Sequence, residues 1–266
     1  MKLTLLGTGH ALTFKYFNTC FLLEENQELF LVDGGGGNYL FNQIEKAGYD
    51  WQNIRTVFVT HKHIDHLLGI IWYIRRVAND IIDDNFEGDV SIYSHTEVID
   101  LLTQMATNLL RPVESELINK RIHLIALNHK DTFFALGNTA QAFDMGSQKA
   151  TQFGFVLSFE NGKTLACCGD EPYRPCCEPF VRNCTWLLHE AFCLFSQADK
   201  YHPYEISHST AKDAAEVAEM LNIANLVLYH TEEDTYPHRK ELYTAEAKKY
   251  FSGAVYVPED LESFIL

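Results

Sequence analysis

The stretch from Arg55 to Ile70 reads RTVFVTHKHIDHLLGI and decides how the rest of the chain is interpreted. It opens with an apolar run over 57–60 that is typical of a strand, and it ends with leucines and isoleucines spaced as in a buried helix. Between the two runs lie four polar residues, His61, His63, Asp65 and His66. The pattern predicts a polar cluster at the carboxyl end of a strand, where open α/β folds bind their ligands.

The spacing of these four residues indicates a metal site. His61 and His63 alternate with Lys62, so in an extended backbone their side chains point the same way. Asp65 and His66 fall on the turn into the helix and can face a second, neighbouring point. Neutral imidazoles with a carboxylate suit Zn²⁺, Mn²⁺ or Fe²⁺ rather than Ca²⁺. The alternative is a merely polar, histidine-rich surface loop, and the two flanking apolar runs argue against it.

The motif that begins at Thr60, T-H-x-H-x-D-H, resembles the H-x-H-x-D-H signature of the metallo-β-lactamase fold superfamily. That resemblance implies an αββα sandwich, in which two mixed β-sheets pack face to face with helices outside. The chain is most similar to ribonuclease Z and its phosphodiesterase relatives, through the ordered motifs LGTG at 6–9, H-x-H-x-D-H, G-D at 169–170, H-E-A at 189–191, H-S-T-A at 208–211 and the strand-end His230. A helix over 239–251 and a strand over 254–257 are predicted to close the chain.

Length and charge limit the classes of function. The chain has 266 residues without a Pro/Gly/Ser-rich linker, so residues 1–266 are expected to form a single domain. With 21 basic and 36 acidic residues the formal charge is −15, a poor match for nonspecific nucleic-acid binding. The start lacks the long apolar region of a signal peptide, and no stretch approaches the ~20 apolar residues of a membrane span. The expectation is a soluble cytoplasmic protein that does not bind membranes.

The resemblance assigns the ligands to two metal sites that share Asp170. One site would use Asp65, His66, Asp170 and His230. The other would use His61, His63 and Asp170. The position of Asp170 after the apolar run 165–168 repeats the strand-end pattern of the first motif, although an aspartate there can also cap a helix. The expected cofactors are therefore two divalent ions, zinc in the first place, with manganese and iron as alternatives.

The resemblance also implies a catalytic pair beside the metals. Glu190 would orient His208, and His208 would assist phosphodiester cleavage, while Asp65 would hold a metal and accept a proton. From the residues alone, the T-x-x-D that begins at Thr210 resembles a capping box, so His208 stands just ahead of a helix whose positive end favours a neutral imidazole. The structural alternative is an internal hydrogen-bond network of His189, Glu190 and His208 with no chemical role.

Two departures from the family pattern affect the expected function. The family has a third metal-binding histidine before the G-D motif, and here Gly146 or Ser147 occupies its place. The site with His61 and His63 is therefore expected to be weaker, although three protein ligands plus water remain a workable catalytic zinc geometry. Ribonuclease Z also inserts a basic tRNA-gripping arm in this interval, whereas residues 147–169 leave room for one hairpin only.

These observations favour a metal-dependent hydrolase, specifically a ribonuclease Z-like phosphodiesterase that uses a metal-bound water or hydroxide. The expected substrate is a small phosphodiester, such as a cyclic nucleotide, or an RNA 3′ end. Two alternatives stay open: a tRNA 3′-end processing endoribonuclease, and a degenerate metal-binding or sensor protein with one weakened site. The resemblance is also compatible with a homodimer. A β-lactamase is disfavoured because no β-lactam pocket is recognisable.

Overall fold

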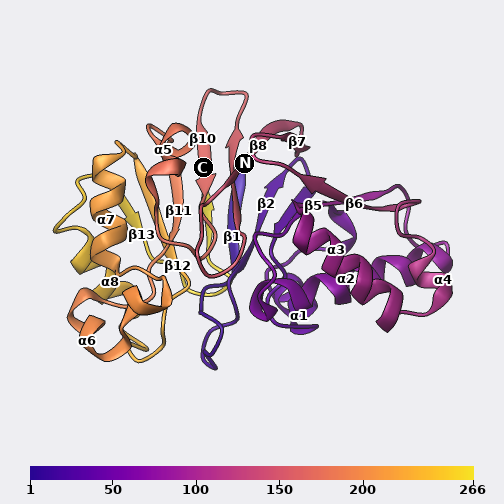
Figure 1. Cartoon of the computed structure of the whole chain (residues 1–266), viewed down its shortest axis with the longest axis horizontal. Coiled ribbons are helices and arrows are strands. Elements are labelled where there is room, and N and C mark those ends of the chain that lie inside the picture. Colours follow the sequence, from indigo (N-terminus) through magenta and orange to yellow (C-terminus); the bar gives the residue numbers. More distant parts are fainter.

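A computed structural model describes residues 1–266 and shows two seven-stranded β-sheets that face each other, with helices on both outer sides (Figure 1). The first sheet contains β1 (Lys2–Gly7), β2 (Cys20–Glu25), β3 (Glu28–Val32), β4 (Ile54–Phe58), β5 (Val90–His95), β6 (Ile122–Leu127) and β14 (Ser263–Ile265). In space these strands follow the order β14-β1-β2-β3-β4-β5-β6. The sheet is mixed, because β14 to β3 pair antiparallel and β3 to β6 pair parallel.

The second sheet repeats this pattern. Its strands are β7 (Thr132–Ala135), β8 (Asn138–Asp144), β9 (Phe153–Ser158), β10 (Thr164–Cys167), β11 (Trp186–Glu190), β12 (Asn225–Tyr229) and β13 (Ala254–Tyr256). Strands β7 to β10 pair antiparallel in sequence order, and β10 to β13 pair parallel. The two mixed sheets confirm the predicted αββα sandwich.

The helices divide between the two outer faces (Figure 1). On the side of the first sheet lie α1 (Tyr39–Lys46), α2 (Ile64–Ile82), α3 (Thr96–Leu109) and α4 (Pro112–Ser115). On the side of the second sheet lie α5 (Glu178–Val181), α6 (Ala198–Tyr201), α7 (Ala211–Met220) and α8 (Arg239–Ala247). Short 3₁₀ turns occur at η1 (Trp51–Asn53), η2 (Pro175–Cys177), η3 (Phe195–Gln197) and η4 (Pro203–Ile206). None of the helices combines the length and apolar character that crossing a membrane requires.

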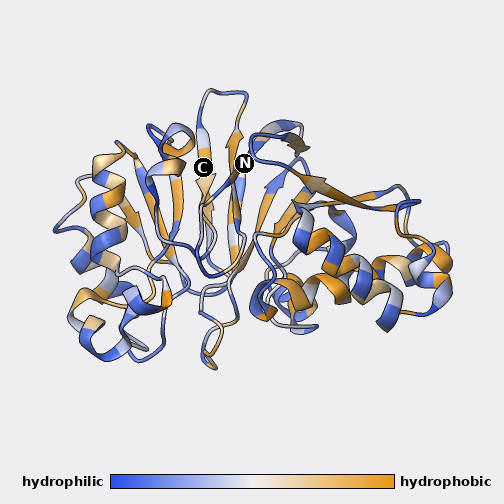
Figure 2. Ribbon diagram, viewed as in Figure 1, coloured by the Kyte–Doolittle hydropathy of each residue, from blue (hydrophilic) through white to orange (hydrophobic).

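Three apolar cores follow from this layering. Side chains alternate along the strands, so Val57 packs towards the helices of the first sheet and Phe58 packs into the space between the sheets. Phe58 meets Phe133 and Phe155 there, from the opposite sheet. Since both faces of the central strands are covered, these strands are apolar on both sides, whereas the helices carry one apolar stripe (Figure 2).

The end of the chain differs from the sequence prediction. The last helix ends at Ala247 rather than at residue 251, and the chain continues past β13 into β14, which pairs with β1. Two short strands, β7 and β14, were not predicted, because runs of three or four residues carry too little periodicity to be distinguished from loops. Both lie at sheet edges, so the layers that position the site are unaffected.

Candidate metal centre

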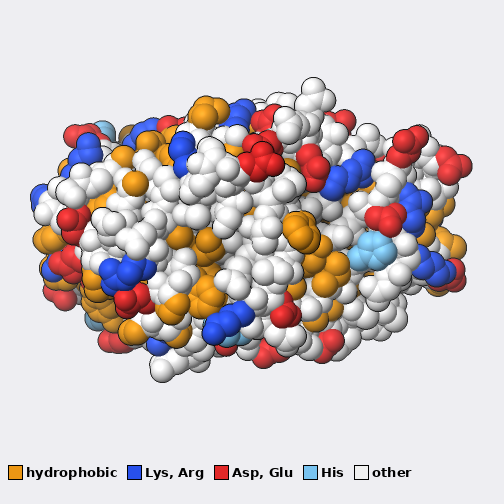
Figure 3. Space-filling model, turned by 90° about the horizontal axis from the view of Figure 1, so that it is seen from above, with side chains coloured by type: hydrophobic (Ala, Val, Ile, Leu, Met, Phe, Trp, Pro, Cys, Tyr) orange, Lys and Arg blue, Asp and Glu red, His pale blue; other side chains and the backbone are white.

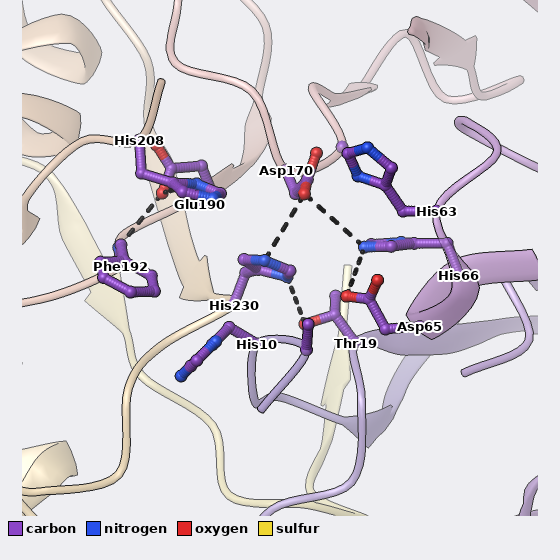
Figure 4. A network of polar contacts seen from close by, with 12 residues as sticks. His10, Thr19, His63, Asp65, His66, Asp170, Glu190, Phe192, His208 and His230 are labelled. Carbon is purple, nitrogen blue, oxygen red and sulfur yellow. Dashed lines mark hydrogen bonds and ion pairs between the residues drawn. The ribbon is translucent and has the colours of Figure 1, made fainter. Parts of the chain in front are cut away.

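The predicted metal ligands follow three parallel strands, β4, β10 and β12, and lie around the carboxylate of Asp170 (Figure 4). His61 and His63 occupy the connection between β4 and α2. His61 Nε2 lies 2.9 Å from His63 Nδ1 and 3.6 Å from Asp170 Oδ1. His61 Nε2 therefore faces both His63 and Asp170, but the donor atoms that lie within 4.8 Å of one another group His61 with His66 and Asp170 and do not include His63.

A second group lies at the other oxygen of the same carboxylate. His66 Nε2 is 3.3 Å from Asp65 Oδ2 and 3.8 Å from Asp170 Oδ2. His230 Nε2 is 3.5 Å from Asp170 Oδ2. Asp65 and His66 lie in the first turn of α2, and His230 follows β12. The structure places these residues near Asp170, but its donor clusters differ from the two predicted sets: they are His61, His66 and Asp170; Asp65, His66 and His230; and Asp170, His208 and His230.

The donor atoms of this cluster fit a cation. His66 Nε2 and Asp170 Oδ1 are buried and have no hydrogen-bond partner. Buried polar atoms normally find a partner, and an unpaired one is costly. Ring nitrogens that point at one another and at carboxylate oxygens form the donor set that zinc and related divalent ions bind. Residues from both groups lie close enough to share an ion, as in the set His61, His66 and Asp170.

Charge states within the cluster also suit a cation. Burial lowers the pKa of His61 and His230 well below the ordinary value and keeps both imidazoles neutral. Burial alone would raise the pKa of Asp170, but His61, His230 and the Lys149 ammonium hold it well below its usual range. His66 is the exception: burial lowers its pKa, yet Asp65 and Asp33 outweigh burial and raise it well above the ordinary value.

The carboxylate of Asp33 contacts His66 on the side of the ring that faces away from the cluster, and the sequence alone did not identify this residue. Asp33 Oδ2 lies 2.7 Å from His66 Nδ1, and the carboxylate accepts hydrogen bonds from the Thr60 amide and hydroxyl at 2.8 Å each. A partner on Nδ1 directs Nε2 of His66 towards the metal centre. The signal was present in the sequence, because Asp33 follows a buried strand as the ligands do.

The remaining ring nitrogens of the cluster are fixed in the same way. His61 Nδ1 lies 3.0 Å from the Thr60 hydroxyl, and His230 Nδ1 lies 3.2 Å from the Thr19 hydroxyl.

The loop after Asp33 packs closely on α2, since a Cβ at Gly69 would lie 1.8 Å from the Gly34 carbonyl oxygen. Glycine at both positions allows the two backbones to approach this closely beside the candidate metal site.

The predicted catalytic pair lies beside His230. His208 Nδ1 is 3.4 Å from Glu190 Oε2, and the His208 ring stacks with Phe192 and with His230 at centroid distances of 5.0 and 5.4 Å. Glu190 is fully buried and accepts hydrogen bonds from the backbone amides of Ser209 at 2.6 Å and Phe192 at 3.1 Å. Glu190 therefore fixes the backbone on both sides of the site as well as facing the imidazole.

Two neighbouring features agree with the sequence analysis. Thr210 and Asp213 form the predicted capping box at the start of α7. His189 uses both ring nitrogens within the protein: Nδ1 lies 2.7 Å from the Glu190 carbonyl oxygen, and Nε2 accepts from the Tyr173 amide at 3.2 Å. His189 is thus occupied structurally, whereas a His208 nitrogen lies within 4.8 Å of the donor atoms of Asp170 and His230.

The segment between β8 and β9, where the resemblance implied a third histidine, places a lysine at the centre. Gly146 has a left-handed φ of 67°, and a Cβ there would lie 3.0 Å from Cys176 Sγ. Lys149 reaches the centre: its Nζ donates to the Asp170 carbonyl oxygen at 3.0 Å and lies 3.5 Å from Asp170 Oδ2. Sequence analysis gave Lys149 no role, because one lysine in a loop carries no pattern.

A pocket of about 330 Å³ opens beside His208. Its lining is mostly polar and includes Gln148, Tyr173, Arg174, Tyr204, His208 and Asp213. Cavities of this volume lie at the lower end of the range that holds small-molecule ligands. A larger hollow, about 1120 Å³, lies over α1 and α2 and contains none of the predicted site residues.

The chain is similar to proteins of known type over its whole length. It is 24% identical to ribonuclease Z of Parabacteroides distasonis over an alignment of 300 residues, gaps included, which covers 95% of each of the two chains. Its structure matches the metallo-β-lactamase fold protein YhfI of Bacillus subtilis with a TM-score of 0.78 at 18% identity, covering 99% and 98% of the two chains. It matches the short form of human tRNase Z with a TM-score of 0.75 at 21% identity, covering 100% and 99%.

The sequence also matches the family described as Anti-Pycsar protein Apyc1 over residues 1–246. That match covers more of the chain than any single motif and includes every predicted ligand. The predicted resemblance to ribonuclease Z is confirmed by the curated relatives. The chain belongs to the Anti-Pycsar protein Apyc1 family and is a ribonuclease Z-like, metal-dependent hydrolase of the metallo-β-lactamase fold.

Proposed function

We propose that the protein is a metal-dependent phosphodiesterase whose substrates are small phosphodiesters, with cyclic nucleotides as the leading class. The observation that carries this proposal is the convergence of two donor groups on Asp170, next to His208 and a pocket of about 330 Å³. Two donor groups that share one carboxylate suit a pair of ions acting on one phosphoryl group. The ribonuclease Z and tRNase Z names of its relatives denote enzymes that cut phosphodiester bonds in RNA.

The proposed cofactors are two divalent ions, with zinc preferred because imidazole and carboxylate donors suit it. One ion would be held by His61, His63 and Asp170. The other would be held by Asp65, His66, Asp170 and His230. When bound, such ions supply positive charge for the phosphoryl oxygens and lower the pKa of water.

The side chains around the ions would handle the protons. Asp65 is buried, and nearby His66 and His230 help to hold its pKa below the usual range despite burial, so its carboxylate is charged and would hold an ion in the first place. In this proposal Asp65 would also accept the proton that the attacking water loses. His208 has Nδ1 towards Glu190, which leaves Nε2 as the atom that would protonate the leaving oxygen. Stacking with Phe192 and His230 restricts the orientation of the His208 ring, as general acid catalysis requires.

Three features favour a small substrate over folded tRNA. The interval that would hold a tRNA-gripping arm contains only the hairpin of β9 and β10. The formal charge is −15, and on the face away from the metal centre, which Figure 3 shows, the basic side chains also lie scattered among acidic ones. Binding of RNA phosphates needs clustered lysines and arginines. Cleavage at an RNA 3′ end stays the second candidate, because the likeness to ribonuclease Z extends over 95% of the chain.

A substrate panel tests the proposal. The metal-loaded protein is incubated with 3′,5′-cyclic mononucleotides, bis(p-nitrophenyl) phosphate and a precursor tRNA that carries a 3′ trailer, with the metal content measured in parallel. Hydrolysis of the small diesters is expected, together with weak tRNA retention on filters that falls further at higher salt. Cleavage of the precursor tRNA alone would establish the endonuclease alternative. Full metal content without any hydrolysis would establish the sensor alternative.

The oligomeric state is a separate proposal. We infer a homodimer from the family resemblance, and multi-angle light scattering of the purified protein measures it directly. A mass of about 61 kDa, twice the 30.5 kDa of the chain, is the expected result. A single species at 30.5 kDa would contradict it.

A further inference from the structure

The segment between β8 and β9 crosses the metal centre, and it does so without the histidine that its relatives are expected to place there. A side chain at position 146 would start against Cys176 and Arg174, at 3.0 and 3.6 Å, so it would be directed at the η2 turn. The residue at position 147 is also engaged elsewhere, because the Ser147 hydroxyl donates to Glu171 Oε2 at 2.9 Å. Neither position offers a ligand to the centre.

Lys149 is the residue of this segment that reaches the centre. Its Nζ donates to the carbonyl oxygens of Asp170 at 3.0 Å and Ser207 at 3.4 Å. The same atom lies 3.5 Å from Asp170 Oδ2 and 3.8 Å from Glu171 Oε2. The side chain is only 17% exposed, so solvent screens its charge weakly. The ammonium thus occupies a position beside the carboxylate that the two donor groups share.

A fixed positive charge at this position has a predictable effect on ion binding. The ammonium partly neutralises Asp170, which would otherwise be available to two divalent ions. Like charges repel more strongly in a partly buried site than in water. The ammonium lies beside Oδ2, the oxygen that faces His66 and His230, so its charge acts on both ions through the shared carboxylate. The ion that shares Asp170 with His61 and His63 has only three protein donors, so it has fewer contacts with which to overcome the repulsion.

We propose that Lys149 supplies a permanent positive charge in place of the third histidine ligand. The centre then holds one ion tightly, at Asp65, His66, Asp170 and His230, and binds the second ion weakly. This inference rests on the proposed metal centre. Lys149 is a positioning residue in this scheme, since it acts on the ions through Asp170.

A purely structural role makes a different prediction. If Lys149 only tied the loop to Asp170 and Ser207, its removal would loosen the centre and weaken ion binding. If its charge limits the second ion, its removal leaves an unopposed carboxylate and strengthens binding of that ion. The sign of the change in affinity therefore distinguishes the two roles.

The experiment is a titration of the metal-free protein with Zn²⁺ alone, followed by calorimetry and by competition with a chromophoric chelator. The wild type is expected to bind one ion tightly and a second at least about 10-fold more weakly. Lys149→Met is expected to tighten the second ion about 10-fold or more, whereas Lys149→Arg, which keeps the charge, should resemble the wild type. Lys149→Gln is the second neutral variant, and it carries the test if the methionine variant does not fold.

The matched control is Lys62→Met. Lys62 stands between His61 and His63 in sequence, yet its Nζ pairs with Glu97 at 3.0 Å and its side chain is 45% exposed. Removal of the Lys62 ammonium should leave the dissociation constants of both Zn²⁺ ions unchanged. The inference would be overturned if the wild type bound two ions equally tightly. It would also be overturned if the neutral Lys149 variants bound the second ion with unchanged or weaker affinity. A wild type that binds no Zn²⁺ would instead refute the metal centre on which the proposed function rests.

Discussion

At the scale of single residues, the candidate ligands are oriented by neighbouring side chains that lie outside the proposed metal sites. Asp33 is the clearest case, because its carboxylate links Thr60 to His66 through contacts of 2.7 to 2.8 Å. A carboxylate behind an imidazole fixes which ring nitrogen faces the metal. The same carboxylate helps to raise the pKa of His66, so an incoming ion must displace a proton from that ring.

Asp33→Asn is expected to weaken ion binding roughly 10- to 100-fold. Asparagine is the suitable substitution because Asp33 has a left-handed φ of 58°, which asparagine tolerates. With its oxygen on the Thr60 amide, its NH₂ group would donate to His66 Nδ1 and force the ring proton onto Nε2. Competition with a chelator of known affinity measures the loss. Unaltered affinity would show that Asp33 does not orient His66.

His208→Ala is expected to lower turnover of a small phosphodiester by roughly 10²- to 10⁴-fold with the metal content unchanged, as for other general acid–base groups. Glu190→Gln should give a smaller loss, since it keeps an acceptor for the Ser209 amide but removes the charge beside the imidazole. Steady-state rates and elemental analysis are measured together. A wild-type rate in His208→Ala means that His208 is structural. Loss of metal means that His208 belongs to the ligand set with Asp170 and His230.

At the scale of elements, each donor follows the carboxyl end of a parallel strand or begins a helix. Strands β4, β10 and β12 deliver His61, Asp170 and His230, and the first turn of α2 delivers Asp65 and His66. The start of α7 positions His208, which precedes the N-terminal cap residue Thr210 by two residues. Helix starts and strand ends are rigid, so they hold side chains more precisely than free loops do.

Thr210→Ala tests whether the α7 cap supports the catalytic position. The Thr210 hydroxyl takes part in the capping box with Asp213, and loss of such a cap typically costs about 1 kcal/mol of the free energy of unfolding. Chemical denaturation is expected to show this loss, and turnover should fall less than in His208→Ala with metal retained. Thr210→Ser, which keeps the hydroxyl, is the matched control. Equal stability of the alanine variant and the wild type would mean that the box contributes nothing.

At the scale of the whole molecule, the proposed ions would join the two halves of the sandwich. His61, His63, Asp65 and His66 follow a strand of the first sheet, while Asp170 and His230 follow strands of the second. Without ions, buried atoms such as His66 Nε2 and Asp170 Oδ1 have no partner. A ligand that binds only the folded state stabilises it by mass action, by about 2.7 kcal/mol at a free concentration 100 times the Kd.

Chelation is therefore expected to lower the Tm of the wild type by several degrees, and added Zn²⁺ should restore it. Asp170→Ala is expected to lose both ions, so its Tm should not respond to chelator or Zn²⁺. Asp83→Ala, at an exposed aspartate distant from the cluster, serves as the control and should respond like the wild type. Elemental analysis of Asp170→Ala provides the independent measurement. Full metal content in that variant would contradict the shared role of Asp170.

The sequence by itself predicted the fold class, six candidate metal ligands and the elements that carry them. These features are local: an apolar run that stops at a polar residue predicts a strand end, and T-x-x-D predicts a helix start at Thr210. The sequence therefore shows that the polar residues at 61–66, 170 and 230 follow strands, although it does not show how close they lie to one another. The edge strands β7 and β14 were not, because they are too short to show a period.

Only the tertiary structure decided which other residues meet these donors. Asp33 approaches His66 because β3 and β4 are parallel neighbours, so their carboxyl ends coincide at one edge. Lys149 approaches Asp170 because the β8–β9 connection crosses that edge, and nothing in a single loop lysine indicates where its ammonium will lie. Such contacts depend on how strands pair and sheets pack, and that pairing brings together residues far apart in the chain that share no local pattern.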